Sequence, residues 1–321
     1  MPAGRLTDVP GVRVGHLTDA VAGSGCTAIL PAPGMVGAVD VRGGGASVRE
    51  TELLQPRSGE REVSALMLSG GSAFGLAVAD GAMRWCDERG IGLATGAGMV
   101  VPIVPAAVIF DLGISANQRR PTADDGYAAC DAASGEPHAV GCVGAGTGAT
   151  VGKWHGRDGW CKGGLGAASA VLPSGQVVAV LAVVNAFGDV IDDDGTVLAG
   201  VWAPGQGFLA ASKEARTGAP QHPRLQGTNT TLLCVATDAP VGSAGAGQLA
   251  RAASTGAARA ISPVGTSLDG DVAFALAARG SDPAFIASVV AADLAAEAIR
   301  DGVRTATSLR GVLSASDLAA E

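Results

Sequence analysis

The stretch from Gly227 to Pro240, GTNTTLLCVATDAP, decides how this chain folds. Its apolar centre begins at Thr230 and predicts a strand, because β-forming residues follow a Gly-Thr-Asn turn and the run ends at Asp-Ala-Pro. Thr230 and Thr231 stand together at the start of this strand. Two hydroxyls at a strand end are either ordinary turn polarity or a reactive group, and the local pattern leaves both interpretations open.

Further strands and helices are predicted on both sides of this strand in the sequence. Strands are predicted at 63–71, 176–191 and 270–278, and helices at 72–90, 245–261 and 282–303. The helices have Ala- and Leu-rich apolar faces, so sheets covered by helices are the expected α/β architecture. The chain has 321 residues, 49 of them glycine and only 3% aromatic, which favours close backbone packing in one domain spanning 1–321.

Composition excludes several classes of function. A net charge of −8 argues against nucleic acid as a partner. The six cysteines and four histidines are dispersed, which predicts reduced thiols and no metal site. The stretch 144–154, GAGTGATVGKW, has Thr147 where a phosphate loop needs glycine and Trp154 where it needs Ser or Thr, so we expect no nucleotide cofactor. With no apolar signal or membrane-length run, the expected location is the cytoplasm and no membrane partner is expected.

A threonine hydroxyl needs a base to act as a nucleophile, and no histidine lies near Thr230 in the sequence. An N-terminal threonine can use its own α-amine, whose ordinary pKa is about 7.7–8.0. That chemistry would require a cut between Asn229 and Thr230, and Gly227 would give the segment slack. The alternative is that Thr230 simply begins the strand.

Other polar residues stand where they could serve a site. Lys153 is one of only three lysines, with Lys162 and Lys213, and a glycine-rich turn precedes it. Asn185 ends the most apolar strand, where it could be an oxyanion donor or could open a turn. In the segment 266–271, TSLDGD, the residues Ser267, Asp269 and Asp271 would share one face if extended; a solvated turn is the other interpretation.

Taken in order, the motifs of this chain resemble those of the L-aminopeptidase/D-esterase family, which includes the nylon-oligomer endo-hydrolase. The motifs that carry the resemblance span nearly the whole chain: LTDVPGVRVGH, GCTAIL, DVRGGG, LSGGSAFGL, VPAAVIFDLG, GAGTGATVGKW, VVNAFG, GTNTTLLCVATDAP and LDGD. The resemblance implies an αββα four-layer sandwich, similar to N-terminal-nucleophile hydrolases but differently connected.

The resemblance also implies a mechanism. The precursor would cut itself into chains 1–229 and 230–321, and Thr230 would become the nucleophile. Lys153 matches the lysine close to the nucleophile, and Asn185 matches the oxyanion asparagine. Ser267 and Asp269 match the pair that positions the amine and hydroxyl; the nylon-oligomer relative has a carboxylate where Ser267 stands. The processed heterodimers are expected to form a homo-oligomer.

Phe110, in VIFDLG, is a departure from the family, whose members usually carry a tyrosine there that serves the site through its hydroxyl. Phenylalanine cannot donate that hydrogen bond, and losing one oxyanion donor can cost roughly 10²–10³ in rate. Either Asn185 and a backbone N–H suffice, or the substrate differs.

The predicted function is an autocatalytically processed aminopeptidase or amidase that acts on small peptides or amino-acid amides without a cofactor. Three alternatives remain. One is an endo-type hydrolase of ω-amino-acid oligomers such as 6-aminohexanoate oligomers. Another is a non-catalytic member that keeps the fold. The third is an enzyme that passes its acyl group to an amine acceptor.

Overall fold

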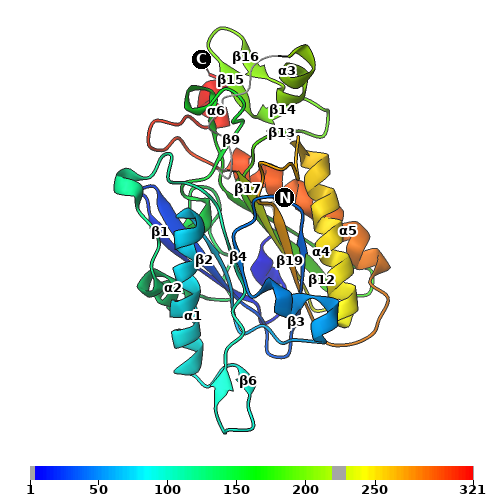
Figure 1. The fold of residues 1–321 in the computed structure, drawn as a ribbon. Helices are drawn as coiled ribbons and strands as arrows, with labels where there is room; N and C mark the ends of the chain where they lie inside the picture. The colour runs from blue at the N-terminus through cyan, green and yellow to red at the C-terminus, as the bar shows by residue number, and fades with distance from the viewer. Residues whose placement is uncertain (1–3, 219–228, 321) are drawn as a thin grey trace.

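The computed structural model describes residues 4–218 and 229–320 and contains two five-stranded sheets stacked face to face (Figure 1). The first sheet has the order β1-β2-β5-β8-β4, with strands Arg13–Asp19, Ser24–Leu30, Leu66–Ser69, Ala106–Val108 and Val48–Arg49. The second has the order β11-β12-β17-β19-β3, with strands Leu165–Val171, Val177–Asn185, Thr230–Thr237, Val272–Ala277 and Val36–Val41. Pairs β5–β8 and β17–β19 are parallel, and the other pairs within these two sheets are antiparallel.

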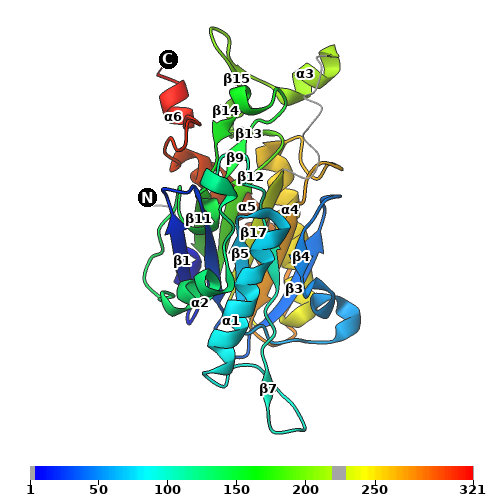
Figure 2. The same ribbon diagram turned by 60° about the vertical axis from the view of Figure 1, so that its left-hand side comes forward.

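Helices cover the outer face of each sheet (Figure 2). α1 (Val78–Asp87) and α2 (Ala123–Asp131) pack on the first sheet, and α4 (Gly242–Ala260) and α5 (Phe285–Arg304) pack on the second. The apolar core therefore forms three layers: helix to sheet, sheet to sheet, and sheet to helix. This is the predicted αββα sandwich, and the expectation is confirmed.

The quoted stretch forms the middle of the second sheet. Every residue of β17 is buried, and its side chains alternate between two apolar layers. Leu232, Cys234 and Ala236 face the first sheet, whereas Leu233 and Val235 face α4 and α5. A strand covered on both faces reads as a nearly continuous apolar run, which is why the sequence pattern identified it.

Glycine lets these layers approach closely at particular points. A Cβ at Gly166 of β11 would lie 2.2 Å from the backbone oxygen of Ala298 in α5. A Cβ at Gly81 of α1 would lie 1.7 Å from the backbone oxygen of Ala123 in α2. Neither neighbour can move aside, because each is backbone. The glycine-rich, aromatic-poor composition therefore reflects backbone-to-backbone packing.

Shorter elements complete the described chain. The small strands are β6 (Leu93–Ala94), β7 (Val100–Val101), β9 (Thr150–Val151), β10 (Cys161–Lys162), β13 (Asp189–Ile191), β14 (Val197–Ala199), β15 (Val201–Ala203), β16 (Gly207–Leu209) and β18 (Ile261–Ser262). The short helices are α3 (Ala211–Thr217) and α6 (Ala315–Leu318). The 3-10 turns are Leu6–Asp8, Thr51–Leu54, Pro56–Ser58, Ser72–Ala77, Ala116–Gln118, Gly144–Gly146 and Arg157–Gly159. None of the helices in the described ranges is long and apolar enough to cross a membrane.

The structure differs from the predicted helix at the start of the segment 72–90. The helix predicted over 72–90 is divided, since Ser72–Ala77 is a 3-10 turn and α1 begins only at Val78. Ser72 has a φ of 55°, outside the helical region, and its N–H donates to the backbone oxygen of Ile109, the residue that follows β8. Gly227, invoked above as slack before the cut, lies outside the described residues.

Candidate active site

Thr230 and Asn185 form a directly opposed pair in the second sheet. Thr230 is the first residue of β17, Asn185 is the last of β12, and the antiparallel register sets them against each other. Opposed side chains share one face of a sheet, with Cβ atoms about 4.5–5.5 Å apart. Thr230 lies on the same face as Leu232, toward the first sheet, and both polar residues are buried. Thr231 points to the opposite face, where it lines a cavity with Leu233 and Asp271.

Lys153 comes to this pair from a glycine turn. Gly152 has a φ of 69°, and the Lys153 N–H donates to the Phe187 backbone oxygen at 3.0 Å, just beyond β12. Its ammonium nitrogen then donates to Asn185 Oδ1 at 2.8 Å and to the Asn185 backbone oxygen at 3.2 Å. The side chain is 1% exposed. Burial lowers the pKa of Lys153 to about 7, although the nearby charges of Asp269 and Asp111 oppose this effect.

These contacts orient the Asn185 amide. Its oxygen also accepts from the Thr150 backbone N–H at 3.0 Å, so Nδ2 must point the other way. Nδ2 donates to the backbone oxygen of Phe110 at 3.4 Å, a long hydrogen bond. The first sheet therefore meets the second here, because Phe110 follows β8. An amide held in one orientation presents its side-chain N–H in a fixed direction, and such a group can stabilise an oxyanion.

The segment 266–271 is a turn, and the extended interpretation is wrong. The Asp269 N–H donates to the Thr266 backbone oxygen, and Asp269 Oδ2 accepts from the Thr266 N–H at 2.9 Å and its hydroxyl at 2.6 Å. Asp269 and Asp271 are buried, whereas Ser267 is exposed. The structure therefore brings Asp269 to the site and leaves Ser267 on the surface.

Thr266 was missed in the sequence analysis. A hydroxyl three residues before an aspartate is a common pairing in local turns, and this spacing was the available signal.

The sequence singled out Asp271 only because it alternates with Ser267 and Asp269. Its carboxylate accepts from the Thr231 N–H at 2.6 Å and the Gly265 N–H at 2.8 Å. Burial, with the neighbouring Asp269 charge, raises the pKa of Asp271 well above its usual range.

The bond between Asn229 and Thr230 lies within these contacts. The Asn229 backbone oxygen accepts from the Gly270 N–H at 2.8 Å, and the Thr230 hydroxyl also donates to it. Asn229 Nδ2 donates to the Leu268 backbone oxygen at 3.2 Å. The hydroxyl of Thr230 is thus held against the carbonyl group of the preceding residue.

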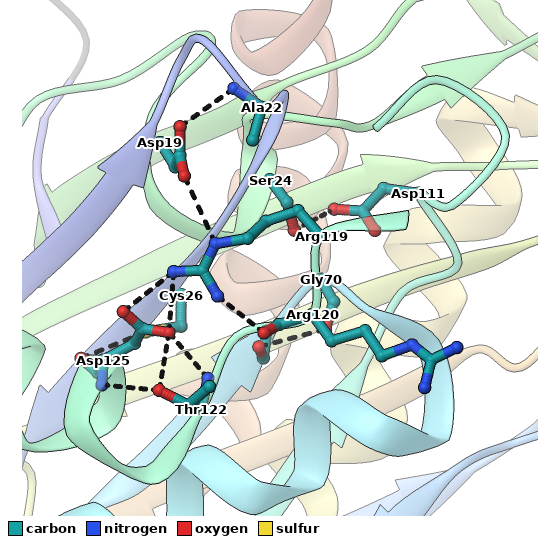
Figure 3. Close-up of polar contacts among 11 residues, drawn as sticks. Asp19, Ala22, Ser24, Cys26, Gly70, Asp111, Arg119, Arg120, Thr122 and Asp125 are labelled. Carbon is teal, nitrogen blue, oxygen red and sulfur yellow. Dashed lines mark hydrogen bonds and ion pairs between the residues drawn. The ribbon is translucent and has the colours of Figure 1, made fainter. Parts of the chain in front are cut away.

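Asp111 adds a buried carboxylate from the first sheet. It follows Phe110 and accepts from the Ser24 hydroxyl at 2.7 Å and the Gly71 N–H at 2.8 Å. Burial raises its pKa to about 6. Figure 3 shows Asp111 beside Ser24, whereas the Arg119 guanidinium lies farther away, between Asp19 and Asp125.

Arg119 stabilises the segment that leads away from Asp111. Its guanidinium bonds Asp19 at 3.2 Å and Asp125 at 2.9 Å, and it also donates to the Arg120 backbone oxygen at 2.6 Å (Figure 3).

Across 4–218 and 229–320, no group of three His, Cys, Asp or Glu side chains is placed to hold a metal ion.

The described structure is a two-sheet sandwich with a hydroxyl, an amide and a lysine gathered where the end of β12 meets the start of β17. Two solved structures share this fold. The Ochrobactrum anthropi L-aminopeptidase D-Ala-esterase/amidase, whose structure was presented as a new variant among the Ntn hydrolase fold, aligns with a TM-score of 0.74 at 21% identity, over 99% of this chain and 93% of that one. A β-aminopeptidase from Burkholderia sp. aligns with a TM-score of 0.73 at 24% identity, over 99% of this chain and 94% of that one.

Sequence comparison identifies the family. The profile of Peptidase family S58 matches residues 4–316. An uncharacterized aminopeptidase of Mycobacterium tuberculosis is 44% identical over 347 aligned positions, covering 98% of this chain and 97% of the relative. The β-peptidyl aminopeptidase BapA of Sphingosinicella xenopeptidilytica is 30% identical over 311 positions, covering 84% of this chain and 68% of the relative. The chain therefore belongs to peptidase family S58 and is a hydrolase of the aminopeptidase type.

Proposed function

We propose that this chain is a self-processing aminopeptidase that cuts itself between Asn229 and Thr230 and then uses Thr230 as an N-terminal nucleophile. The observation that carries the proposal is the hydrogen bond from the Thr230 hydroxyl to the Asn229 carbonyl oxygen. A nucleophile and the carbonyl it attacks are then neighbours before any reaction. The products would be chains 1–229 and 230–321.

Before the cut Thr230 has no α-amine, so another base must take the hydroxyl proton. Lys153 suits this step because its pKa of about 7 leaves much of it neutral at physiological pH. Its nitrogen bonds Asn185, the residue directly opposite Thr230. The Thr230 oxygen bonds to the Asn229 carbonyl carbon, the C–N bond breaks, and the proton passes to the Thr230 nitrogen. Water then hydrolyses the ester to an Asn229 carboxylate and a free Thr230 hydroxyl.

In turnover, the new α-amine would activate the same hydroxyl toward a substrate. Two amines in one buried site disfavour each other's protonation, so charge on Lys153 lowers the pKa of the α-amine toward neutrality. The acyl group passes from substrate to Thr230 and then to water. Asn185 Nδ2 would stabilise the oxyanion in place of the tyrosine hydroxyl that Phe110 lacks. The buried Asp269 would keep the turn at 266–271 next to the new α-amine. Ser267 is exposed, which does not support a direct contact between Ser267 and that amine.

The proposed substrates are small peptides or amino-acid amides with a free N-terminus. Peptides that begin with a β-amino acid are a second candidate, favoured by two relatives that are described as β-aminopeptidases. Hydrolysis of matched α- and β-amino-acid p-nitroanilides would separate the two. Assembly into a homo-oligomer of processed heterodimers stays a prediction from the resemblance, and a cytoplasmic location stays a prediction from the sequence.

Intact mass spectrometry of purified protein tests the cut. We expect wild type to give fragments 1–229 and 230–321, and Thr230→Ala to remain one inactive chain. Thr231→Ala is the matched control, because that side chain lies on the opposite face of the sheet from Thr230; it should be cut like wild type. Amidase activity in an uncut wild-type chain would refute the mechanism.

A further inference from the structure

The loop from Leu268 to Asp271 lies along the peptide bond that is to be cut. We infer that this loop is a clamp for self-cleavage, and that the Gly270 backbone N–H is the oxyanion donor for the attack of Thr230 on Asn229. The inference rests on the proposed function and adds a catalytic group that the side-chain motifs do not contain.

The donor is already in place in the uncut chain. The Gly270 N–H lies 2.8 Å from the Asn229 oxygen, at ordinary hydrogen-bond length, and both residues are buried. As the Thr230 oxygen bonds to the carbonyl carbon, the carbonyl electron pair moves onto this oxygen. A fixed, buried N–H stabilises that developing charge without any reorganisation.

The loop also holds the residues on both sides of the bond. On one side, Asn229 Nδ2 donates to the Leu268 backbone oxygen at 3.2 Å, and Asn229 forms a parallel bridge with Asp269. On the other side, the Thr231 N–H donates to Asp271 Oδ1 at 2.6 Å. The peptide is therefore held at its carbonyl, at the side chain before it and at the backbone after it.

Two buried carboxylates make the loop itself rigid. Asp269 accepts from the N–H and hydroxyl of Thr266 and, at 3.4 Å, from the Phe187 N–H. Asp271 accepts from the Gly265 N–H as well as from Thr231. A donor on a loop with this many bonds keeps its direction while the carbonyl becomes tetrahedral.

Space explains why residue 270 is glycine. A Cβ there would lie 2.7 Å from the Thr230 hydroxyl oxygen and 3.1 Å from the Gly45 backbone oxygen. The Gly270 backbone is outside the left-handed region, so a side chain is excluded by contact rather than by conformation. Only a residue without a side chain lets this N–H reach the carbonyl while the nucleophile keeps its position.

The sharpest test removes the N–H and leaves the shape. Glycolic acid in place of Gly270, introduced by in vitro translation, converts that amide to an ester. The full-length chain is quenched at intervals, and the 1–229 and 230–321 fragments are followed by electrophoresis. We expect self-cleavage to slow by roughly 10²-fold, the effect of losing one oxyanion donor. The same ester at Gly96, a position with open space around it and no hydrogen bond from its N–H within the described ranges, should cut like wild type.

A second pair of variants tests the space around the nucleophile. Gly270→Ala should also slow the cut, whereas Gly96→Ala should not, and thermal melts would show that all variants fold. If the chain with the ester at Gly270 cuts itself at the wild-type rate, the Gly270 N–H is not the oxyanion donor, even if Gly270→Ala cuts slowly. Failure of wild type to cut at all would instead overturn the proposed function, so the two failures are distinguishable.

Discussion

Two lysines are buried in this protein, and their surroundings differ in kind. Lys153 and Lys162 are 1% and 0% exposed, and burial lowers the pKa of both. Lys162 donates to three backbone oxygens, of Ala149 at 2.6 Å, Gly163 at 2.8 Å and Gly146 at 3.5 Å. Lys153 instead bonds the side chain and backbone of Asn185, opposite Thr230.

The difference shows how position decides what a buried ammonium does. An ammonium has three N–H donors, and backbone carbonyls that accept all three favour the charged form and fix it in place. Lys162 therefore acts as a cross-link within the glycine-rich segment. Lys153 bonds the side chain of Asn185, directly opposite Thr230, so its proton can be exchanged where the chemistry occurs. We infer a structural role for Lys162 and a proton-transfer role for Lys153.

Replacing Lys153 is expected to have the largest effect. Lys153→Met should slow self-cleavage by about 10²–10⁴-fold, the range for a lost general base, and should leave the protein folded. Lys153→Arg should not rescue the cut, because a guanidinium stays protonated. Intact mass over time and a thermal melt measure the two properties.

The exposed Lys213 on α3 provides the control, since Lys213→Met should cut and melt like wild type. A Lys153→Met chain that cuts at the normal rate would remove the distinction between the two buried lysines.

Lys162→Met should give the opposite result. The Ala149 and Gly146 oxygens keep a backbone donor, the N–H of Gly163 at 2.9 Å and that of Ala149 at 3.2 Å, whereas the Gly163 oxygen loses its Lys162 donor. One unpaired buried group costs about 1–3 kcal/mol. The loss is a large share of a typical free energy of unfolding of about 5–15 kcal/mol. Chemical denaturation should therefore show reduced stability, while the molecules that fold still cut. Undiminished stability together with a lost cut would reverse the two roles.

The two lysines also show what the sequence could predict. The β17 strand, its covering helices and the opposite directions of Thr230 and Thr231 follow from apolar periodicity, and the structure confirms them. Lys153 could be singled out because a family motif contains it. The sequence around Lys162 does not predict that this lysine is buried. The backbone oxygens that accept hydrogen bonds from its ammonium come together only in the folded chain.

The turn at 266–271 shows the same limit for the site. Alternation placed Ser267 with Asp269 and Asp271, but local hydrogen bonds from Thr266 bend the segment and leave Ser267 exposed. Gly270 and Asn229 are 41 positions apart in the sequence. They meet only because the fold places the segment before β17 parallel to the segment before β19.

The pH dependence of the cut should identify which form of Lys153 reacts. A pKa of about 7 means that the neutral amine predominates above pH 7 and the ammonium below it. The rate of self-cleavage should rise with pH, level off above pH 7, and fall about tenfold for each unit below it. Freshly translated chain moved to buffers from pH 5.5 to 9 gives this profile. A rate that falls as pH rises through 7 would mean that the cation is required and that Lys153 is not the base.

The smallest effect concerns Asp111, whose charge opposes that of Lys162 at Lys153. The Asp111 carboxylate raises the pKa of Lys153 and the Lys162 ammonium lowers it. Asp111→Asn keeps the shape and can still accept from Gly71 and donate to Ser24. Removing its charge should move the midpoint of the cleavage profile to lower pH, so the variant cuts faster than wild type at pH 6 and equally fast at pH 9.

Ser24→Ala serves as the control for Asp111→Asn, because it removes a hydrogen bond of residue 111 and keeps the carboxylate. Lys162→Met should move the midpoint the opposite way, since the repulsion that favours neutral Lys153 is gone. Shifts of opposite sign from these two variants are expected only if the titrating group lies within the field of both charges. A midpoint that rises in Asp111→Asn would mean that another group controls the cut.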